Sequence, residues 1–126
     1  METITVKEFA DFLCKEDKRY EEKLTDGFLQ GDVLTRKAAA KMTHVYMKDV
    51  LKIKDIEDIN PAEKLRDLYD CRTCVNHIAQ VYLRGIMDAV EIDGISEGSL
   101  FVFDGKGEVS PKEAREIVER VRKLTI

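Results

Sequence analysis

The same kind of helix start occurs three times in this chain. The three phrases are "ITVKEFADFL" from Ile4, "VLTRKAAAKM" from Val33 and "VSPKEAREIV" from Val109. In each phrase an aliphatic residue precedes Thr or Ser, and a Lys stands two positions after the hydroxyl residue. A hydroxyl at this place accepts hydrogen bonds from the first N–H groups of a helix, which have no partner within the helix. The fold must therefore accommodate three capped helices, which begin after Thr5, Thr35 and Ser110.

Capping chemistry accounts for part of this similarity. Glu8 and Glu113 stand three positions after the hydroxyl in "TVKE" and "SPKE", where a carboxylate reaches back to the N–H of the cap residue. Pro111 favours the backbone angle of a first helical position. In "TRKA", Ala38 takes the place of the Glu. The sequence thus predicts a reciprocal capping box at the first and third starts.

The segments leading into two of these helices also match. "GDVLT" from Gly31 and "GEVS" from Gly107 both run Gly, acid, Val before the cap, and an Asp-Gly pair precedes each of them. A turn, an aliphatic residue and a capped helix, used twice in this order, indicate a supersecondary repeat.

Hydrophobic periodicity predicts four main helices. They cover about residues 6–24, 36–51, 60–84 and 111–124. Glycines gather in the connections, and "SLFVF" in the long connection before the last helix is compatible with one short strand. One strand alone does not make a sheet. We therefore expect an all-α fold, a single helical domain over residues 1–126 with long Gly-rich loops.

Composition and charge exclude several function classes. The net charge is −4 and the cations are spread along the chain, which disfavours nucleic-acid binding. Apolar runs are too short for insertion into a membrane. The two histidines, His44 and His77, have no neighbouring nucleophile motif, so we expect no catalytic residues, no enzyme activity and no cofactor.

The segment "CRTCVNH" raises the question of a metal site. Thiolates and imidazole are good zinc ligands, but the segment lies inside a predicted helix, where His77 is about 120° away from Cys71. Haem attachment requires a His directly after the second Cys, where Val75 stands. With Cys14, the cysteine count is odd, which argues against a disulfide framework. We expect Cys71 and Cys74 to be reduced, buried and small apolar residues, with zinc as the alternative.

The segment "VFDGKGEVSPKE" has the spacing of a calcium loop. Its first and fifth positions are Val102 and Lys106, which offer no side-chain oxygen as a ligand. We therefore predict no metal site here.

The repeated phrases resemble the S-layer homology domain. "VNHIAQVYLRGIMDA" is similar to the end of the first helix of such a unit and its turn, and "FVFDGKGEVSPKEAREIVERV" to its loop and second helix. "DGFLQGDVLTRKAAAKM" and "ITVKEFADFL" are similar to the motif helices of two further units. The resemblance implies a pseudo-threefold bundle of motif helices. It also implies non-covalent binding of anionic, often pyruvylated, bacterial cell-wall polysaccharide in grooves between units.

The resemblance places a ligand site at the helix starts. Arg36 would bind a glycan carboxylate with two parallel hydrogen bonds, next to Thr35 and Ser110. The positive ends of the helix dipoles favour an anion there. Lys7, Lys37 and Lys112 occupy the same place in each repeat, where a cation is unfavourable against the dipole. A cation repeated at an unfavourable place favours a binding function.

The sequence departs from a regular array, and it leaves a rival interpretation. The motif starts are separated by 30 and then 75 residues, only Thr35-Arg36 keeps the Thr-Arg pair, and there is no Trp. The rival is an intracellular helical adaptor or regulator that binds a protein partner. The expected location is the cell surface if a leader has been removed, and otherwise the cytoplasm.

Overall fold

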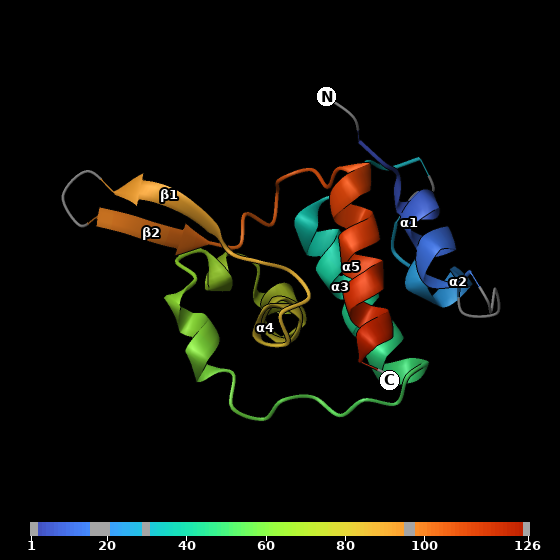
Figure 1. Cartoon of the computed structure of the whole chain (residues 1–126), viewed down its shortest axis with the longest axis horizontal. Helices are drawn as coiled ribbons and strands as arrows, with labels where there is room; N and C mark the ends of the chain where they lie inside the picture. Colours follow the sequence, from blue (N-terminus) through green and yellow to red (C-terminus); the bar gives the residue numbers. More distant parts are fainter. Residues whose placement is uncertain (1–2, 16–20, 29–30, 95–97, 125–126) are drawn as a thin grey trace.

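The computed structural model describes residues 3–15, 21–28, 31–94 and 98–124. The fold is mostly helical, as expected, but it also contains a small antiparallel hairpin, so the all-α prediction is corrected (Figure 1). The α-helices are α1 (Val6–Leu13), α2 (Glu21–Leu24), α3 (Arg36–Asp49), α4 (Val75–Leu83) and α5 (Pro111–Lys123). The 3₁₀ turns are η2 (Asn60–Lys64), η3 (Leu68–Asp70) and η4 (Arg72–Cys74), and the strands are β1 (Val90–Gly94) and β2 (Gly98–Val102).

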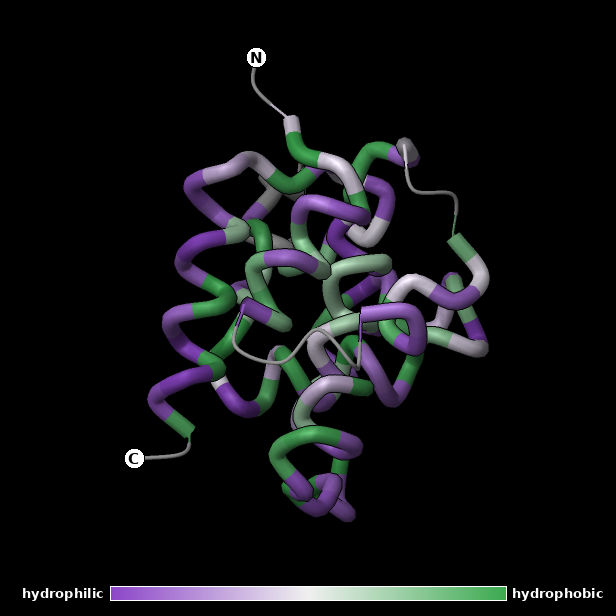
Figure 2. Tube along the Cα trace, turned by 90° about the vertical axis from the view of Figure 1, so that its right-hand side faces the viewer, coloured by the Kyte–Doolittle hydropathy of each residue, from purple (hydrophilic) through white to green (hydrophobic). Residues whose placement is uncertain are grey.

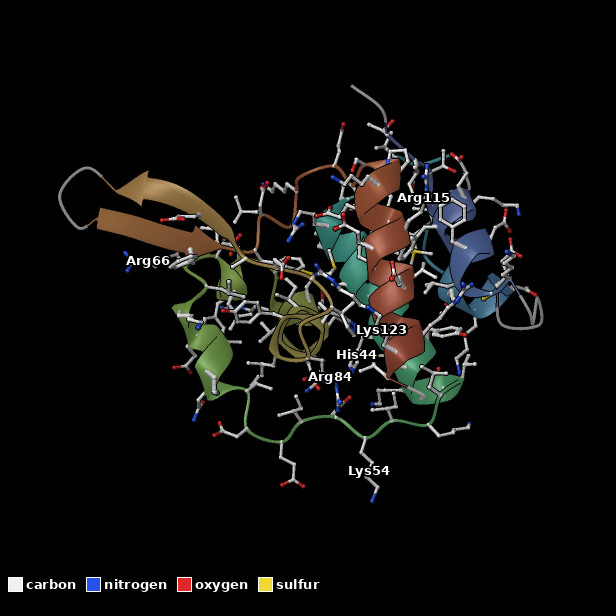
Figure 3. The ribbon with its side chains drawn as sticks, viewed as in Figure 1. His44, Lys54, Arg66, Arg84, Arg115 and Lys123 are labelled. Atoms are coloured by element: carbon white, nitrogen blue, oxygen red, sulfur yellow. A yellow bond between two sulfur atoms is a disulfide. The ribbon has the colours of Figure 1, made fainter. Side chains whose placement is uncertain are left out.

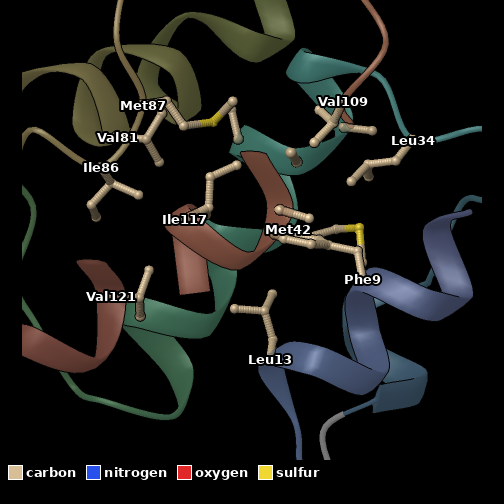
Figure 4. Close-up of a cluster of buried hydrophobic side chains, with 14 of the residues drawn as sticks. Phe9, Leu13, Leu34, Met42, Val81, Ile86, Met87, Val109, Ile117 and Val121 are labelled. Carbon is tan, nitrogen blue, oxygen red and sulfur yellow. The ribbon is translucent and has the colours of Figure 1, made fainter. Parts of the chain in front are cut away.

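The core lies where α1, α3 and α5 meet α4. α5 has apolar residues spaced three and four apart, and Figure 2 shows its hydrophobic turns on the side facing the molecule. Figure 4 shows the cluster that results, in which side chains from the different helices interlock. Its fully buried members include Phe9, Leu34, Met42, Val81 and Ile117.

The predicted caps form, but only one capping box is complete. In α1 the Thr5 hydroxyl accepts from the Glu8 N–H (3.2 Å) and the Glu8 carboxylate accepts from the Thr5 N–H (3.1 Å). In α5 the Ser110 hydroxyl accepts from the Glu113 N–H at 3.1 Å. The Glu113 carboxylate instead binds Arg36. A buried guanidinium therefore takes the carboxylate that was predicted to close the second box.

The predicted boundaries of the second and fourth helices are confirmed, whereas the first predicted helix is divided. α3 and α5 match the predicted ranges to within two residues. α1 ends at Leu13, with Cys14 as its C-cap, and a separate short α2 follows at Glu21. Residues 16–20 of the predicted first helix lie outside the described residues.

The third predicted helix is wrong over its first half. Residues 60–74 form three 3₁₀ turns, and only Val75–Leu83 is α-helical. Leu65 and Leu68 are buried. The backbone of Leu65 is extended, however, and forms an isolated parallel bridge with Phe101 of β2. Gly85 ends α4 in the left-handed conformation (φ 72°), where glycine fits without strain.

The hairpin extends away from the helices (Figure 1). β1 and β2 pair antiparallel, with Val90 opposite Val102. Below the hairpin, the Asp67 carboxylate accepts hydrogen bonds from the N–H groups of Phe103 (2.7 Å) and Asp104 (2.8 Å). The "SLFVF" segment is thus part of a two-stranded sheet. The side chain of Asp67, the N-cap of η3, attaches the end of this segment to the rest of the fold.

Candidate functional site

The three helix starts lie side by side. Leu34 donates its N–H to the Ile4 carbonyl at 2.8 Å and accepts from the Val109 N–H at 2.9 Å. On either side, Val6 donates to Asp32, and Arg36 donates to Gly107, both at 2.8 Å. We call the three hydrogen-bonded segments, residues 4–6, 32–36 and 105–109, the helix-start ladder.

The ladder brings together Thr5, Thr35 and Ser110, which are far apart in the sequence. α1, α3 and α5 therefore begin at one edge of the molecule, the upper one in Figure 1. The hydroxyls of Thr35 and Ser110 each accept from an N–H three residues on. Both residues are half-buried caps, so their first role is to hold the helix ends.

Arg36 lies inside the molecule, with only 6% of its surface exposed. Its Nε donates to the Phe103 carbonyl at 2.8 Å, its two terminal nitrogens bind Glu113 and the Asp88 carbonyl, and its guanidinium lies 4.8 Å from the Phe103 ring centre. Arg36 was predicted to bind a glycan carboxylate with two parallel hydrogen bonds. Its guanidinium instead donates its hydrogen bonds to groups of this chain. Arg36 joins α3 to α5 and to the segments flanking the hairpin.

The three repeated lysines have different surroundings. Lys7 forms ion pairs with Asp11 (3.1 Å) and Glu21 (2.7 Å), and hydrogen bonds to Glu21 and then Asp11 raise its pKa above the ordinary value. Lys112 is exposed, and Lys37 is half-buried beside a hollow described below. The structure thus places them at equivalent helix positions without gathering them in one pocket.

A groove of about 360 Å³ lies between α1 and α5. Its lining, which we call the α1–α5 groove, consists of Phe12, Lys15, Arg115, Val118, Glu119 and Arg122. Three cations and one carboxylate surround two apolar side chains, in a chain whose net charge is negative. Figure 3 shows Arg115 on the side of α5 that faces α1.

These groove residues were not singled out from the sequence. A weak signal exists, because Arg115, Val118, Glu119 and Arg122 are spaced three and four apart and so share one face of α5. The contribution of Phe12 and Lys15 depends on how α1 packs against α5, and the sequence does not encode that locally.

The expectation for the cysteines is corrected. Cys71 and Cys74 form a disulfide, while Cys14 is buried and takes no part in it. Cys71 is the N-cap of the 3₁₀ turn η4 and Cys74 is its last residue, so the two do not share an α-helical face, and their Cα atoms are 5.2 Å apart. This turn is compact enough for a bond between residues three apart. The pair therefore offers no thiolates for zinc.

Cys71 lines a second hollow, of about 240 Å³. We call it the Cys71 hollow. Its other lining residues are Lys37, Asp67, Asp70, Ile78, Asp104, Gly105 and Lys106. It connects the start of α3 with the turns that precede α4.

The two histidines form a hydrogen-bonded chain with Asp55. His44 is buried, with its Nε2 2.6 Å from the Asp55 carboxylate and its Nδ1 2.7 Å from Nδ1 of His77. Burial first, and then the charges of His44 and Lys41, lower the pKa of His77 to about 4.

No three His, Cys, Asp or Glu side chains in the described part of the chain are grouped so as to hold a metal ion.

None of the described helices is both long and apolar enough to cross a bilayer.

Comparison with known proteins gives a similarity in fold. No protein-family model and no curated protein matches the chain. The solved structure of an undecaheme cytochrome from the S-layer of Carboxydothermus ferrireducens is similar, with a TM-score of 0.71 and 14% sequence identity. The match covers 99% of this chain and 18% of the cytochrome, so this chain spans less than a fifth of that protein's length.

Proposed function

We propose that this chain is a non-catalytic module that binds anionic cell-surface polysaccharide, as its sequence resemblance to S-layer homology domains implies. The observation that carries the proposal is the α1–α5 groove. There Lys15, Arg115 and Arg122 oppose the single carboxylate of Glu119. A local excess of positive charge on an acidic chain attracts an anion to that place rather than to the whole surface.

The chemistry of the lining suits a sugar acid. Arginine side chains bind carboxylates with parallel hydrogen bonds. Phe12 and Val118 provide an apolar floor against which the C–H face of a sugar ring packs. This assignment moves the ligand contacts from Arg36, which is committed to internal partners, to exposed cations of the same helix bundle.

The helix-start ladder gives the groove fixed walls. α1 and α5 do not depend on packing alone, because both of their starts are hydrogen-bonded to the segment before α3. A binding site on preorganised elements loses less entropy when its ligand binds.

The S-layer origin of the similar cytochrome supports a location at the cell surface for this chain. Its haem chemistry does not extend here, because Val75 occupies the position after Cys74 where attachment of a haem requires His. The segment "CRTCV" of this chain therefore lacks the haem-attachment motif.

The test is co-sedimentation of the whole chain with purified carboxylate-bearing cell-wall glycan. The same glycan with its carboxylates reduced to alcohols serves as the comparison. We expect the Arg115→Ala/Arg122→Ala variant to bind at least about tenfold more weakly, the effect of losing one charge-assisted hydrogen bond or more. Lys54→Ala is the matched control, because Figure 3 shows Lys54 on the opposite edge and pointing away from the body.

Three results would contradict the proposal. They are equal binding by the wild type and the double variant, equal binding to the reduced glycan, and no binding by the wild type. In the last case, retention of a specific protein from the same cells would favour the adaptor interpretation.

A further inference from the structure

The single disulfide of the described residues closes a very short ring. Cys71 and Cys74 are three positions apart, and both are half-buried rather than enclosed. A disulfide stabilises a fold mainly by restricting the unfolded chain, and this restriction is smallest for short rings. A bond placed where it contributes little to stability, and where solvent reaches it, has the character of a reactive bond.

The two sulfur atoms have different electrostatic surroundings. Cys74 is the residue directly before α4, a nine-residue helix with no acidic side chain in its first turn and no side-chain cap. The positive end of the helix dipole stabilises negative charge at this place. Cys71 lines a hollow that contains the carboxylates of Asp67, Asp70 and Asp104 and the ammonium groups of Lys37 and Lys106.

This difference fixes the direction of a reaction. In thiol–disulfide exchange the attacked sulfur needs access, and the departing sulfur leaves faster when its thiol is more acidic. Cys71 has the open hollow beside it, and Cys74 has the helix start. The Thr73 hydroxyl lies 3.5 Å from Sγ of Cys71, on the segment between the two sulfurs.

We propose that the Cys71–Cys74 disulfide is a thiol–disulfide exchange site for a dithiol reductant, attacked at Cys71 with Cys74 as the leaving group. The thiolate of the dithiol forms a bond to Sγ of Cys71, the Cys71–Cys74 bond breaks, and Cys74 departs as a thiolate. The second thiol of the dithiol, once deprotonated, then attacks the first sulfur of the dithiol, which is bonded to Cys71. This releases Cys71 as a thiolate. The dithiol loses two electrons and becomes a disulfide, while Cys71 and Cys74 take up both electrons and two protons.

This inference does not depend on glycan binding. The Cys71 hollow and the α1–α5 groove have no lining residue in common. Either proposal can therefore fail alone.

The first experiment tests exchange in the folded chain. The protein is equilibrated with mixtures of reduced and oxidised dithiothreitol, quenched with acid, and its thiols are counted by maleimide mass tagging. We expect two thiols to appear in graded steps while the far-ultraviolet circular dichroism stays native and buried Cys14 stays untagged. A bond that is reduced only when denaturant unfolds the chain would overturn the proposal.

The second experiment tests the direction. The fully reduced wild type is alkylated with iodoacetamide at a series of pH values, and peptide mass spectrometry measures the reaction of each cysteine. Because the wild type is used, the experiment does not require a variant to fold. We expect Cys74 to react with a midpoint below the ordinary thiol value of about 8.5, and Cys71 with a midpoint at or above it. The single variants C71S and C74S should reproduce the two midpoints. Equal or reversed midpoints would overturn the assignment of the leaving group.

Discussion

Two regions of this molecule provide hydrogen-bond partners for their backbone N–H and carbonyl groups in different ways. Around the helix-start ladder, the polar backbone groups between helices bond to each other, as Leu34 does with Ile4 and Val109. Around α4 and the base of the hairpin, backbone groups also pair with each other, but side chains provide several of the partners. Both the N–H and the carbonyl of Ile56 bond to Gln80, and Asp67 accepts from Phe103 and Asp104.

This difference indicates in which region a single substitution lowers the stability of the fold most. Buried backbone groups need partners in either region. A side chain that provides two partners is removed by one mutation, whereas backbone-to-backbone bonds persist whichever side chain is present. We expect the side-chain-held region to be the more sensitive one, and the following predictions are in order of decreasing effect.

The largest effect is expected for Arg36→Leu, at the junction of the two regions. The variant leaves two carbonyls and the Glu113 carboxylate without their donor, and should lower the free energy of unfolding by about 3 to 4 kcal/mol. Urea denaturation measures this, with exposed Lys112→Ala as the control. A loss below about 1 kcal/mol, the range of a surface ion pair, would show that the region does not depend on this side chain.

Gln80→Leu should cost about 2 to 3 kcal/mol. Leucine is similar in size to the fully buried Gln80 side chain, but it leaves the N–H and the carbonyl of Ile56 without their partners. Glu57→Ala, an exposed change beside the same segment, is the control in the same denaturation series. Equal stability of the two variants would mean that water replaces the amide without loss.

The histidine chain should make stability depend on pH. The pKa of His77 in the folded chain is about 4, below its ordinary 6.5. Between these values the unfolded chain binds a proton that the folded chain does not, so stability falls as pH falls from 6.5 to 4, by about 1 to 2 kcal/mol for a half-buried group. His77→Asn should flatten this part of the urea-midpoint profile. An unchanged slope in the variant would assign the effect to other groups.

The smallest effect is expected for Ser110→Ala in α5. Loss of the cap should cost about 1 kcal/mol, because one N–H loses its acceptor while the ladder keeps its backbone bonds. Hydrogen exchange should show the Val109 N–H still protected. Loss of that protection would mean that the cap and the ladder form as one unit.

The same contrast explains which features the sequence predicts. The starts of α1, α3 and α5 follow from residues within one turn of each cap, so local chemistry is sufficient. Residues 60–74 were predicted as helix because Leu65 and Leu68 recur three apart, a spacing that 3₁₀ turns share. The bond from the Arg66 N–H to the Phe101 carbonyl decides between them, and it spans 35 residues.

The candidate site follows the same division. The residues Thr5, Thr35 and Ser110 were found because they repeat, and the structure brings their segments together. The burial of Arg36 depends on Phe103, Asp88 and Glu113, which no local pattern connects to it. The α1–α5 groove likewise combines residues about 100 positions apart, so its charge is visible only after folding.

The order of the segments in the ladder has a consequence for synthesis. The middle segment, residues 32–36, leaves the ribosome well before one of its two neighbours, residues 105–109. Until then the guanidinium of Arg36 has neither Phe103 nor Glu113 to bind. Because chains emerge from the amino end, α1 and α3 must remain without these partners, and open to chaperones, until residues 103–113 have emerged.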